Sequence, residues 1–392
     1  MNDLCADISY KSLIKYGEQL CGDMIEIVSP NENSTVVVLA DGMGSGVKAN
    51  ILSTLTSKII STMMANSMSV EECVATVADT LPVCKVRGVA YSTFTILHIE
   101  DNKEAELIQY DNPRTILLRD GKELDYPYVT TVIGGKDITK ARFTVQDGDA
   151  FVLMSDGVIH AGVERTLNYG WQRENVVQYM EKMYRPDMTA NGLNMLLLDE
   201  CNRLYDGKPG DDTTVCTVKI RKRNPVNLLF GPPSDPSDVG KMMSLFFSKE
   251  GSHVVCGGTT SQLAAEFLGK KVEVDMSYID SEIPPVARIE GVDLVTEGVI
   301  TMSRVLEYAK SYLGTNDIDI CPEWMYSEDG ASKLAMVLFE EATDINFFVG
   351  RAINPAHQNP KLPINFNIKM QIVEELSQAL TAMGKRVKVS YF

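Results

Sequence analysis

The fold of the first half is decided by an apolar run that passes into an acidic, glycine-rich turn, Thr35-Val36-Val37-Val38-Leu39-Ala40-Asp41-Gly42-Met43-Gly44-Ser45-Gly46. The β-branched residues of this run predict a buried strand. A helix is predicted directly after it, at 47–65, where Ile51, Leu55 and Ile59 recur at helical spacing. Ser45 suits the N-cap of this helix. Asp41 is therefore expected at the end of a rigid element.

Three further acidic motifs punctuate the first half: Cys21-Gly22-Asp23, Ser155-Asp156-Gly157 and Gly210-Asp211-Asp212-Thr213-Thr214. A single Asp-Gly pair is more typical of a turn than of a ligand. Several such motifs, each next to an apolar β run, instead indicate carboxylates that rigid elements hold together. Carboxylates, carbonyls and waters are the ligands that Mg²⁺ and Mn²⁺ prefer. A glycine after Asp41 would also let the Gly42 carbonyl approach an ion while Asp41 bridges two.

From about residue 20 the first half consists of short β-rich runs broken by helical stretches. Strands are predicted at 24–29, 35–39, 91–99, 104–110, 115–119, 150–154 and 213–220, and helices at 47–65, 70–81, 173–184 and 190–204. Strands that follow one another, with the helices segregated from them, predict an α+β sandwich rather than a parallel βαβ sheet.

A domain boundary is predicted at the basic stretch Arg221-Lys222-Arg223-Asn224-Pro225, which gives domains 1–224 and 225–392. Beyond it strands and helices alternate, which predicts a smaller α/β domain with a mostly parallel sheet covered by helices. The predicted strands are 226–230, 252–256, 271–274, 292–296, 345–350 and 386–391, and the predicted helices are 239–247, 261–268, 299–312, 332–341 and 368–382.

One pair of turns in the second half is a candidate ligand site. A predicted strand ends in Cys256-Gly257-Gly258-Thr259-Thr260-Ser261 and passes directly into a helix, and Glu297 follows strand 292–296 in the same way. In a parallel sheet both turns lie at the carboxyl edge, where α/β folds bind ligands, and free N–H groups at 259–261 would suit a small anion. A Gly-Gly pair with a capping Thr is also what a tight strand-to-helix turn requires. Both interpretations stay open.

The composition limits the class of function. Among 392 residues, 37 basic and 53 acidic side chains give a formal charge of -16, which would repel nucleic acid and anionic lipid. No apolar run reaches the roughly 18 residues of a membrane span, and the first residues do not resemble a secretory signal. Eight scattered cysteines without a Cys-x-x-Cys pair are typical of reduced, buried thiols. We expect a cytoplasmic protein with neither nucleic acid nor membrane as a partner.

The acidic motifs, in their order, resemble those of the bacterial SpoIIE-type serine/threonine phosphatases, part of the metal-dependent type 2C (PPM-type) phosphatase superfamily. The resemblance rests on Asp23, on segments 40–46 and 148–158, and on Asp211-Asp212-Thr213-Thr214, and Tyr110-Asp111-Asn112-Pro113 is similar to a loop of that family. It covers about residues 1–220. It implies an antiparallel β-sandwich flanked by helices, with a pair of metal ions at one end.

The resemblance also implies roles for individual residues. Two Mn²⁺ or Mg²⁺ ions would be bridged by Asp41, with the Gly42 carbonyl, Asp156 and Asp211 completing the coordination and Asp23 reaching a metal directly or through water. Asp41, Asp156 and Asp211 would thus be the catalytic residues, and Asp212 is the less certain member of its pair. The implied activity is hydrolysis of phosphoserine or phosphothreonine on a regulatory protein by metal-activated water. The second domain would be regulatory or substrate-docking, and a homodimer is compatible with the sequence.

Several points stay open at this stage. Met43 stands where eukaryotic members of the superfamily carry a His that could protonate the leaving group, so the general acid is not identified. Arg87, Arg114 and Arg142 are available, but none is assigned to the phosphate. Two other functions are compatible with the sequence: a non-catalytic signalling protein that senses a metal or ligand, and a phosphatase of a small phosphorylated metabolite.

Overall fold

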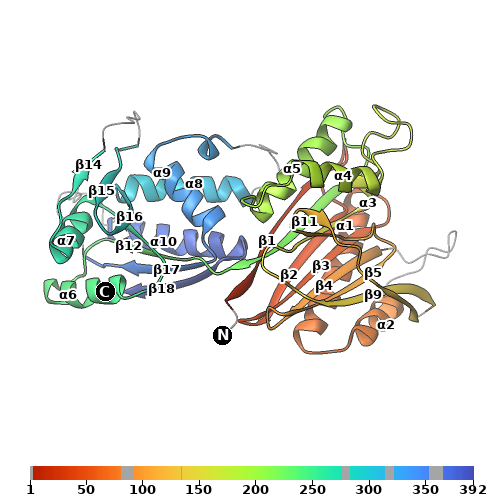
Figure 1. The fold of residues 1–392 in the computed structure, drawn as a ribbon, viewed down its shortest axis with the longest axis horizontal. Coiled ribbons are helices and arrows are strands. Elements are labelled where there is room, and N and C mark those ends of the chain that lie inside the picture. Colours follow the sequence, from red (N-terminus) through yellow and green to blue (C-terminus); the bar gives the residue numbers. More distant parts are fainter. Residues whose placement is uncertain (1–2, 81–91, 134, 276–282, 314–321, 353–364) are drawn as a thin grey trace. The chain divides into compact units, whose positions relative to one another are not determined.

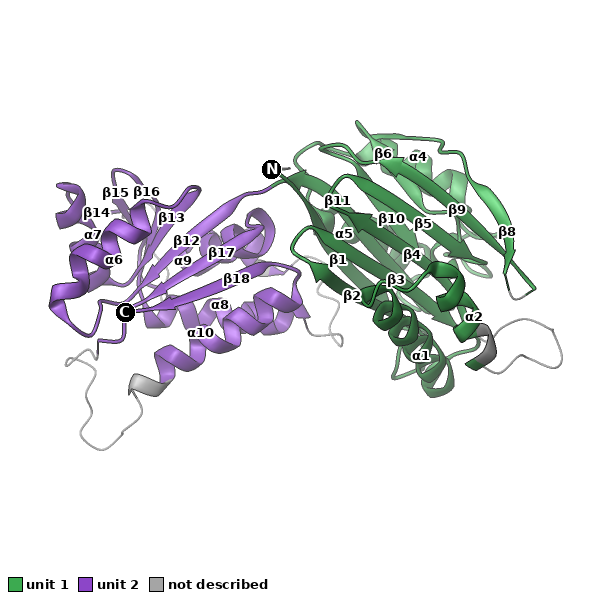
Figure 2. Ribbon diagram, turned by 90° about the horizontal axis from the view of Figure 1, so that it is seen from below, with its two compact units in different colours: residues 1–222 green, residues 223–392 purple. Residues whose placement is uncertain are grey.

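A computed structural model describes residues 3–80, 92–133, 135–275, 283–313, 322–352 and 365–392 (Figure 1). The chain divides into two compact units, Met1–Lys222 and Arg223–Phe392, which Figure 2 colours separately. The division lies within the basic stretch 221–225.

Unit 1 contains two antiparallel sheets. Its strands are β1 Leu4–Leu13, β2 Asp23–Asn31, β3 Ser34–Gly42, β4 Ser92–Glu100, β5 Glu104–Tyr110, β6 Ile116–Arg119, β7 Lys122–Glu123, β8 Val129–Ile133, β9 Lys136–Thr144, β10 Ala150–Met154 and β11 Thr213–Lys222. One sheet has six strands in the order β2-β3-β4-β5-β9-β8, and the other has five in the order β1-β11-β10-β6-β7. Leu39 and Leu107 of the first sheet pack in one buried cluster with Phe151 and Val218 of the second, so a hydrophobic core lies between the sheets.

Helices cover the outer faces of this sandwich. They are α1 Gly46–Ala65, α2 Val70–Thr80, α3 Asp156–Ile159, α4 Arg173–Met183 and α5 Ala190–Leu204. Helices α1 and α2 lie against the six-stranded sheet, and α4 and α5 lie against the five-stranded one (Figures 1 and 2). The predicted α+β sandwich of antiparallel sheets flanked by helices is confirmed.

Helix α1 forms where the sequence predicts it, but of its predicted apolar stripe only Ile59 packs toward the sheet. Ile51 and Leu55 are exposed, whereas Ser53, Thr56 and Ser57 are buried. Burial of these hydroxyls is tolerable because each donates to a carbonyl of its own helix. The N-cap prediction is wrong in one respect, since the Ser45 hydroxyl makes no capping bond and donates to Glu18.

Unit 2 is an α/β unit built on one seven-stranded sheet. Its strands are β12 Pro225–Phe230, β13 Ser252–Cys256, β14 Glu273–Val274, β15 Ala287–Ile289, β16 Val292–Thr296, β17 Asp344–Val349 and β18 Arg386–Tyr391. Its helical segments are η1 Pro236–Asp238, α6 Val239–Phe247, α7 Gly258–Leu268, α8 Val299–Leu313, η2 Glu323–Met325, α9 Gly330–Ala335, the π-helical turn η3 Met336–Glu341 and α10 Asn365–Ala382.

The strand order in unit 2 is β14-β15-β16-β13-β12-β17-β18. The five strands β16, β13, β12, β17 and β18 are parallel to one another, whereas β15 pairs antiparallel with both β16 and β14 at one edge. One buried cluster lies under α8, α9 and α10, and another lies under α6 and α7. The predicted mostly parallel sheet is confirmed. Within the described ranges, no helix is both long and apolar enough to cross a membrane.

Candidate metal centre

Two of the predicted ligands come from neighbouring strands of the six-stranded sheet. Asp23 at the start of β2 lies directly opposite Asp41 near the end of β3. Like charges opposite each other on paired strands destabilise a sheet. The chain therefore holds two carboxylates in an arrangement that becomes favourable only when protons or cations neutralise it.

The other predicted ligands come from the ends of two paired strands in the five-stranded sheet. Asp156 follows β10 and begins α3, and Asp211 and Asp212 precede β11. Two hydrogen bonds hold these strand ends together, from the Ser155 amide to the Thr214 carbonyl (3.0 Å) and from the Thr214 amide to the Ser155 hydroxyl (2.9 Å). The acids of both sheets thus lie at the same end of the sandwich.

The electrostatics show that these carboxylates lie close to one another. Burial raises the pKa of Asp41, and the charges of Asp23, Asp156 and Asp211 raise that pKa further. Burial likewise raises the pKa of Asp156, with Asp211 the next largest cause. Four predicted ligands are therefore within electrostatic reach of one another, and each makes it harder for the others to hold a negative charge.

Asp23 is the most deeply placed carboxylate of the cluster. Both of its oxygens are buried and make no hydrogen bond in the described part of the chain, although the hydroxyls of Thr214 and Ser155 lie near enough to lower its pKa. Burial raises that pKa by more than the hydroxyls lower it. A buried carboxylate without a hydrogen bond is costly, and a bound cation is one way to remove that cost.

Asp211 and Asp212 are neighbours with different surroundings. Asp212 accepts hydrogen bonds from the backbone amides of Lys15 (3.0 Å) and Gly22 (2.9 Å), so both of its oxygens are already used. The Asp211 carboxylate is 42% exposed and uses one oxygen, which accepts from the adjacent Asp212 amide at 3.1 Å and pairs with the Lys15 ammonium at 3.6 Å. This contrast favours Asp211 over Asp212 as a ligand, and it gives Asp212 the structural task of fixing the loop before β2.

Two glycines allow the acidic turns to approach their neighbours. A Cβ at Gly42 would lie 2.1 Å from the Ala49 carbonyl oxygen of α1, and a Cβ at Gly157 would lie 2.1 Å from the Asp212 carbonyl oxygen. Real side chains do not tolerate such distances, so these positions need glycine for packing. That need is independent of any role of the Gly42 carbonyl toward an ion.

Asp111 is a further acid near the cluster that the sequence reasoning did not assign to it. It follows β5 with a φ of 56°, and its charge contributes to the raised pKa of Asp156. The next residue, Asn112, accepts a hydrogen bond at 2.5 Å from the hydroxyl of Thr93, which pairs with Asp41 across β3 and β4. The signal available in the sequence was the segment Asp111-Asn112-Pro113 directly after a predicted strand, which indicates a turn but not its direction.

The donor set fits a hard divalent cation in chemistry, since it is all carboxylate and includes a buried carboxylate with no hydrogen bond. Among the described residues, however, no three Asp, Glu, His or Cys side chains are already arranged as ligands of one ion. The site is therefore a group of neighbouring carboxylates, of which Asp211 pairs with Lys15.

The candidate ligand turns of unit 2 lie where the sequence places them, and most of their polar groups have internal partners. Gly257 adopts a φ of 114° between β13 and α7. The Thr260 hydroxyl accepts from the Gly231 amide at 3.1 Å, and the Glu297 carboxylate accepts from the Ile300 amide at 3.0 Å. These bonds are those of a tight turn and a helix cap. Gly258 and Thr259 lie in the first turn of α7.

The comparison with protein families gives one match. Residues 31–221 match the family model described as Stage II sporulation protein E (SpoIIE). Stage II sporulation protein E of Bacillus subtilis (strain 168) is 22% identical over 217 residues, which cover 54% of this chain and 25% of that protein. The chain thus spans about a quarter of the length of this curated relative.

Solved structures from Bacillus subtilis are also similar to this chain. The phosphatase domain of the cell fate determinant SpoIIE, in a crystal form without domain swapping, has a TM-score of 0.45 and 18% identity, and the match covers 57% of this chain and 95% of that one. The PP2C phosphatase domain of SpoIIE with a fragment of its regulatory domain has a TM-score of 0.47 and 19% identity, covering 56% of this chain and 65% of that one.

Proposed function

We propose that the protein is a metal-dependent phosphoprotein phosphatase. The premise of this proposal is that residues 31–221 are a SpoIIE-type serine/threonine phosphatase segment. The observation that carries the proposal is the acidic cluster at one end of the sandwich. Asp23, Asp41 and Asp156 have raised pKa values because desolvation and neighbouring carboxylates disfavour their charged forms, and the buried Asp23 makes no hydrogen bond in the described part of the chain. A site of this kind is suited to divalent cations.

We assign the ligands of two Mn²⁺ or Mg²⁺ ions to Asp23, Asp41, Asp156, Asp211 and the Gly42 carbonyl. When bound, the ions would polarise the phosphoryl group and activate water for attack on phosphorus. Asp41, opposite Asp23 and within reach of Asp156 and Asp211, is the natural bridging ligand. Asp212 is a positioning residue, because its carboxylate orders the loop that carries Gly22 and leads to Asp23.

The substrate we propose is phosphoserine or phosphothreonine on a regulatory protein. Unit 2 would then be a regulatory or substrate-docking domain, since its helix-covered parallel sheet has the architecture in which α/β folds place ligands at the carboxyl edge. If that edge takes a small anion, the first turn of α7, at Gly258 and Thr259, is the place for it.

The test is hydrolysis of p-nitrophenyl phosphate and of a phosphothreonine peptide with Mn²⁺. EDTA and the substitution Asp41→Asn should each abolish turnover, whereas Asp199→Asn, which removes an exposed acid on α5, should leave it unchanged. Activity that survives in Asp41→Asn would refute the ligand assignment. Manganese binding without turnover would instead favour a non-catalytic sensor, and turnover confined to small phosphate esters would favour a metabolite phosphatase.

A further inference from the structure

A pocket opens in unit 1 beside the acidic cluster. It has a volume of about 170 Å³ and is lined from three directions, by β5 and the loop after it, by the segment before β8, and by β9. The lining side chains that the argument uses are Asp111, Arg114, Tyr126, Tyr128, Asp137 and Lys140. This volume is on the scale of one amino-acid side chain.

The pocket adjoins the candidate metal centre. Asp111 lines it, and the charge of Asp111 acts on Asp156. Asn112 also lines it and accepts the hydrogen bond from Thr93, the residue opposite Asp41. A peptide whose phosphorylated residue lies over the acidic cluster could therefore place a nearby side chain in this pocket.

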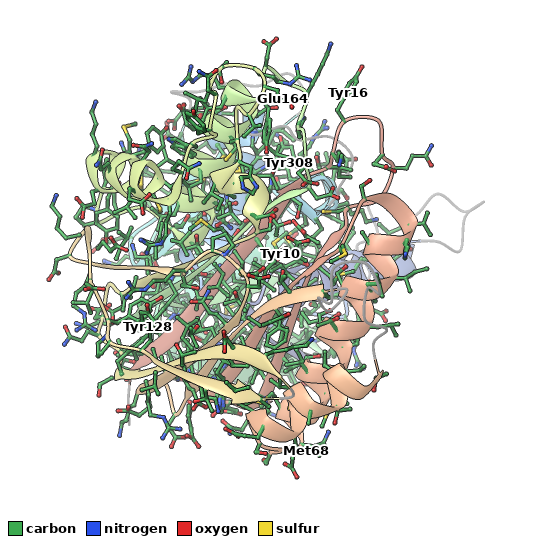
Figure 3. The ribbon with its side chains drawn as sticks, turned by 90° about the vertical axis from the view of Figure 1, so that its right-hand side faces the viewer. Tyr10, Tyr16, Met68, Tyr128, Glu164 and Tyr308 are labelled. Carbon is green, nitrogen blue, oxygen red and sulfur yellow. The ribbon has the colours of Figure 1, made fainter. Side chains whose placement is uncertain are left out.

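One wall of the pocket is rigid and aromatic. The guanidinium of Arg114 lies over the rings of Tyr126 (4.4 Å) and Tyr128 (5.1 Å) and donates to Asp125 and to the Tyr126 carbonyl. Tyr126 is buried, and its hydroxyl donates to the Thr115 carbonyl at 2.7 Å. Tyr128, labelled in Figure 3, also lines the pocket and is 52% exposed, and is therefore the lip of the pocket at the surface. This wall of the pocket is therefore preorganised for a ligand.

The charges of the pocket do not balance. Arg114 is paired with Asp125, and Lys140 is paired with Glu71 of α2, so each cation of the pocket already has a carboxylate partner at the surface. The acids Asp111 and Asp137 have no ion-pair partner in the part of the chain that the structure describes. The pocket consequently presents two uncompensated negative charges and an aromatic lip.

We propose that this pocket is a specificity site that accepts a Lys or Arg side chain next to the phosphorylated residue of a protein substrate. The acids would pair with the cationic head, and the ring of Tyr128 would lie along the aliphatic stem. A basic neighbour also offsets the repulsion between a phosphorylated peptide and a chain of formal charge -16. The inference rests on the proposed phosphatase activity and names the substrate feature that the site selects.

The experiment compares phosphothreonine peptides that are otherwise uncharged. Lys is placed in turn at each of the three positions before and after the phosphothreonine, and norleucine at the same position is the neutral control of equal length. We expect Lys to raise kcat/KM about five- to tenfold at one or two of these positions. Asp137→Asn should remove most of this preference, and Asp137→Lys should transfer it to peptides with Glu at that position.

Two controls separate this proposal from the proposed function. p-Nitrophenyl phosphate has no flanking residue, so parent protein and Asp137→Asn should hydrolyse it equally with Mn²⁺. Asp199→Asn removes an exposed acid far along the chain on α5 and should keep the Lys preference. If p-nitrophenyl phosphate is hydrolysed but Lys and norleucine peptides react equally, or if the preference survives in Asp137→Asn, the pocket assignment is wrong. If no phosphate ester is hydrolysed, the proposed function fails and the pocket assignment fails with it.

Discussion

Asp41 is the residue at which the cost of the acidic cluster is greatest, because it is buried and three other carboxylates act on it. A carboxyl group whose pKa is higher in the folded than in the unfolded protein favours folding while it is protonated. As pH rises above the usual Asp value of about 4, the unfolded chain releases this proton more readily than the folded one. The metal-free protein should therefore lose stability toward neutral and alkaline pH.

The first prediction follows from this loss of stability with rising pH. In EDTA, Asp41→Asn should raise the melting temperature at pH 8 by on the order of 5 °C, since Asn has no proton that the unfolded chain would release more readily than the folded one. The gain should shrink toward pH 4 and vanish below it, where the carboxyl group becomes protonated in both states. Thermal melts at both pH values measure this, with Asp199→Asn as the control. A variant that is equally destabilised at both pH values would contradict the electrostatic account.

The second prediction separates Asp211 from Asp212. Asp212→Ala should cost about 1–3 kcal/mol of stability even in EDTA, because two backbone amides lose their acceptor. Asp211→Ala should change the metal-free stability by no more than about 1 kcal/mol, as its carboxylate is partly exposed and makes one loose ion pair and one hydrogen bond, from the adjacent Asp212 amide. Urea unfolding in EDTA and titration with Mn²⁺ test the pair. The assignment is reversed if Asp211→Ala unfolds more easily and binds manganese normally.

Much of the site could be predicted from the sequence alone. Residue type decides which side chains can bind a metal, and the ends of apolar runs show where strands end. Asp23, Asp41, Asp156 and Asp211 are close together in the structure as the motifs indicated. Asp111 could not be placed, since its approach to Asp156 depends on how the turn after β5 folds back.

Among the elements, α1 shows why a periodic pattern gives a helix but not its orientation. Ile51 and Leu55 repeat at the right spacing, yet the sheet contacts the opposite face, which carries Leu52 and small hydroxyl residues. Because these side chains are small and their hydroxyls donate to carbonyls of the same helix, α1 can approach β2 and β3 closely.

The third prediction uses this orientation. Leu52→Ser should destabilise the protein by about 2–4 kcal/mol, because it removes a buried side chain and leaves a cavity. Leu55→Ser, three residues further along the same helix, should change stability by no more than about 0.5 kcal/mol. Chemical unfolding of both variants measures the difference. Equal losses would mean that α1 is rotated relative to the structure.

Two of the strands that the sequence analysis did not predict, β1 and β9, share one property. β1 and β9 alternate polar and apolar residues weakly, and neither contains a β-branched run like that of β3. β1 pairs with β11 along all ten of its residues, so its conformation is stabilised by a partner some two hundred positions away in the chain. Such a strand depends on tertiary pairing more than on local propensity. The apolar strands β12 and β13 of the parallel sheet in unit 2 were predictable because local propensity favours a strand at these residues.

At the scale of the whole molecule, ions bound at the acidic cluster would act as cross-links in the chain. Asp23 and Asp41 belong to one sheet of the sandwich, whereas Asp156 and Asp211 follow or precede strands of the other. Ions held by all four would tie together residues from the beginning, middle and end of unit 1, and so close chain loops in the way that a disulfide does. The cofactor proposed for the chemistry would then also be a staple between the two layers, and chelation would release both at once.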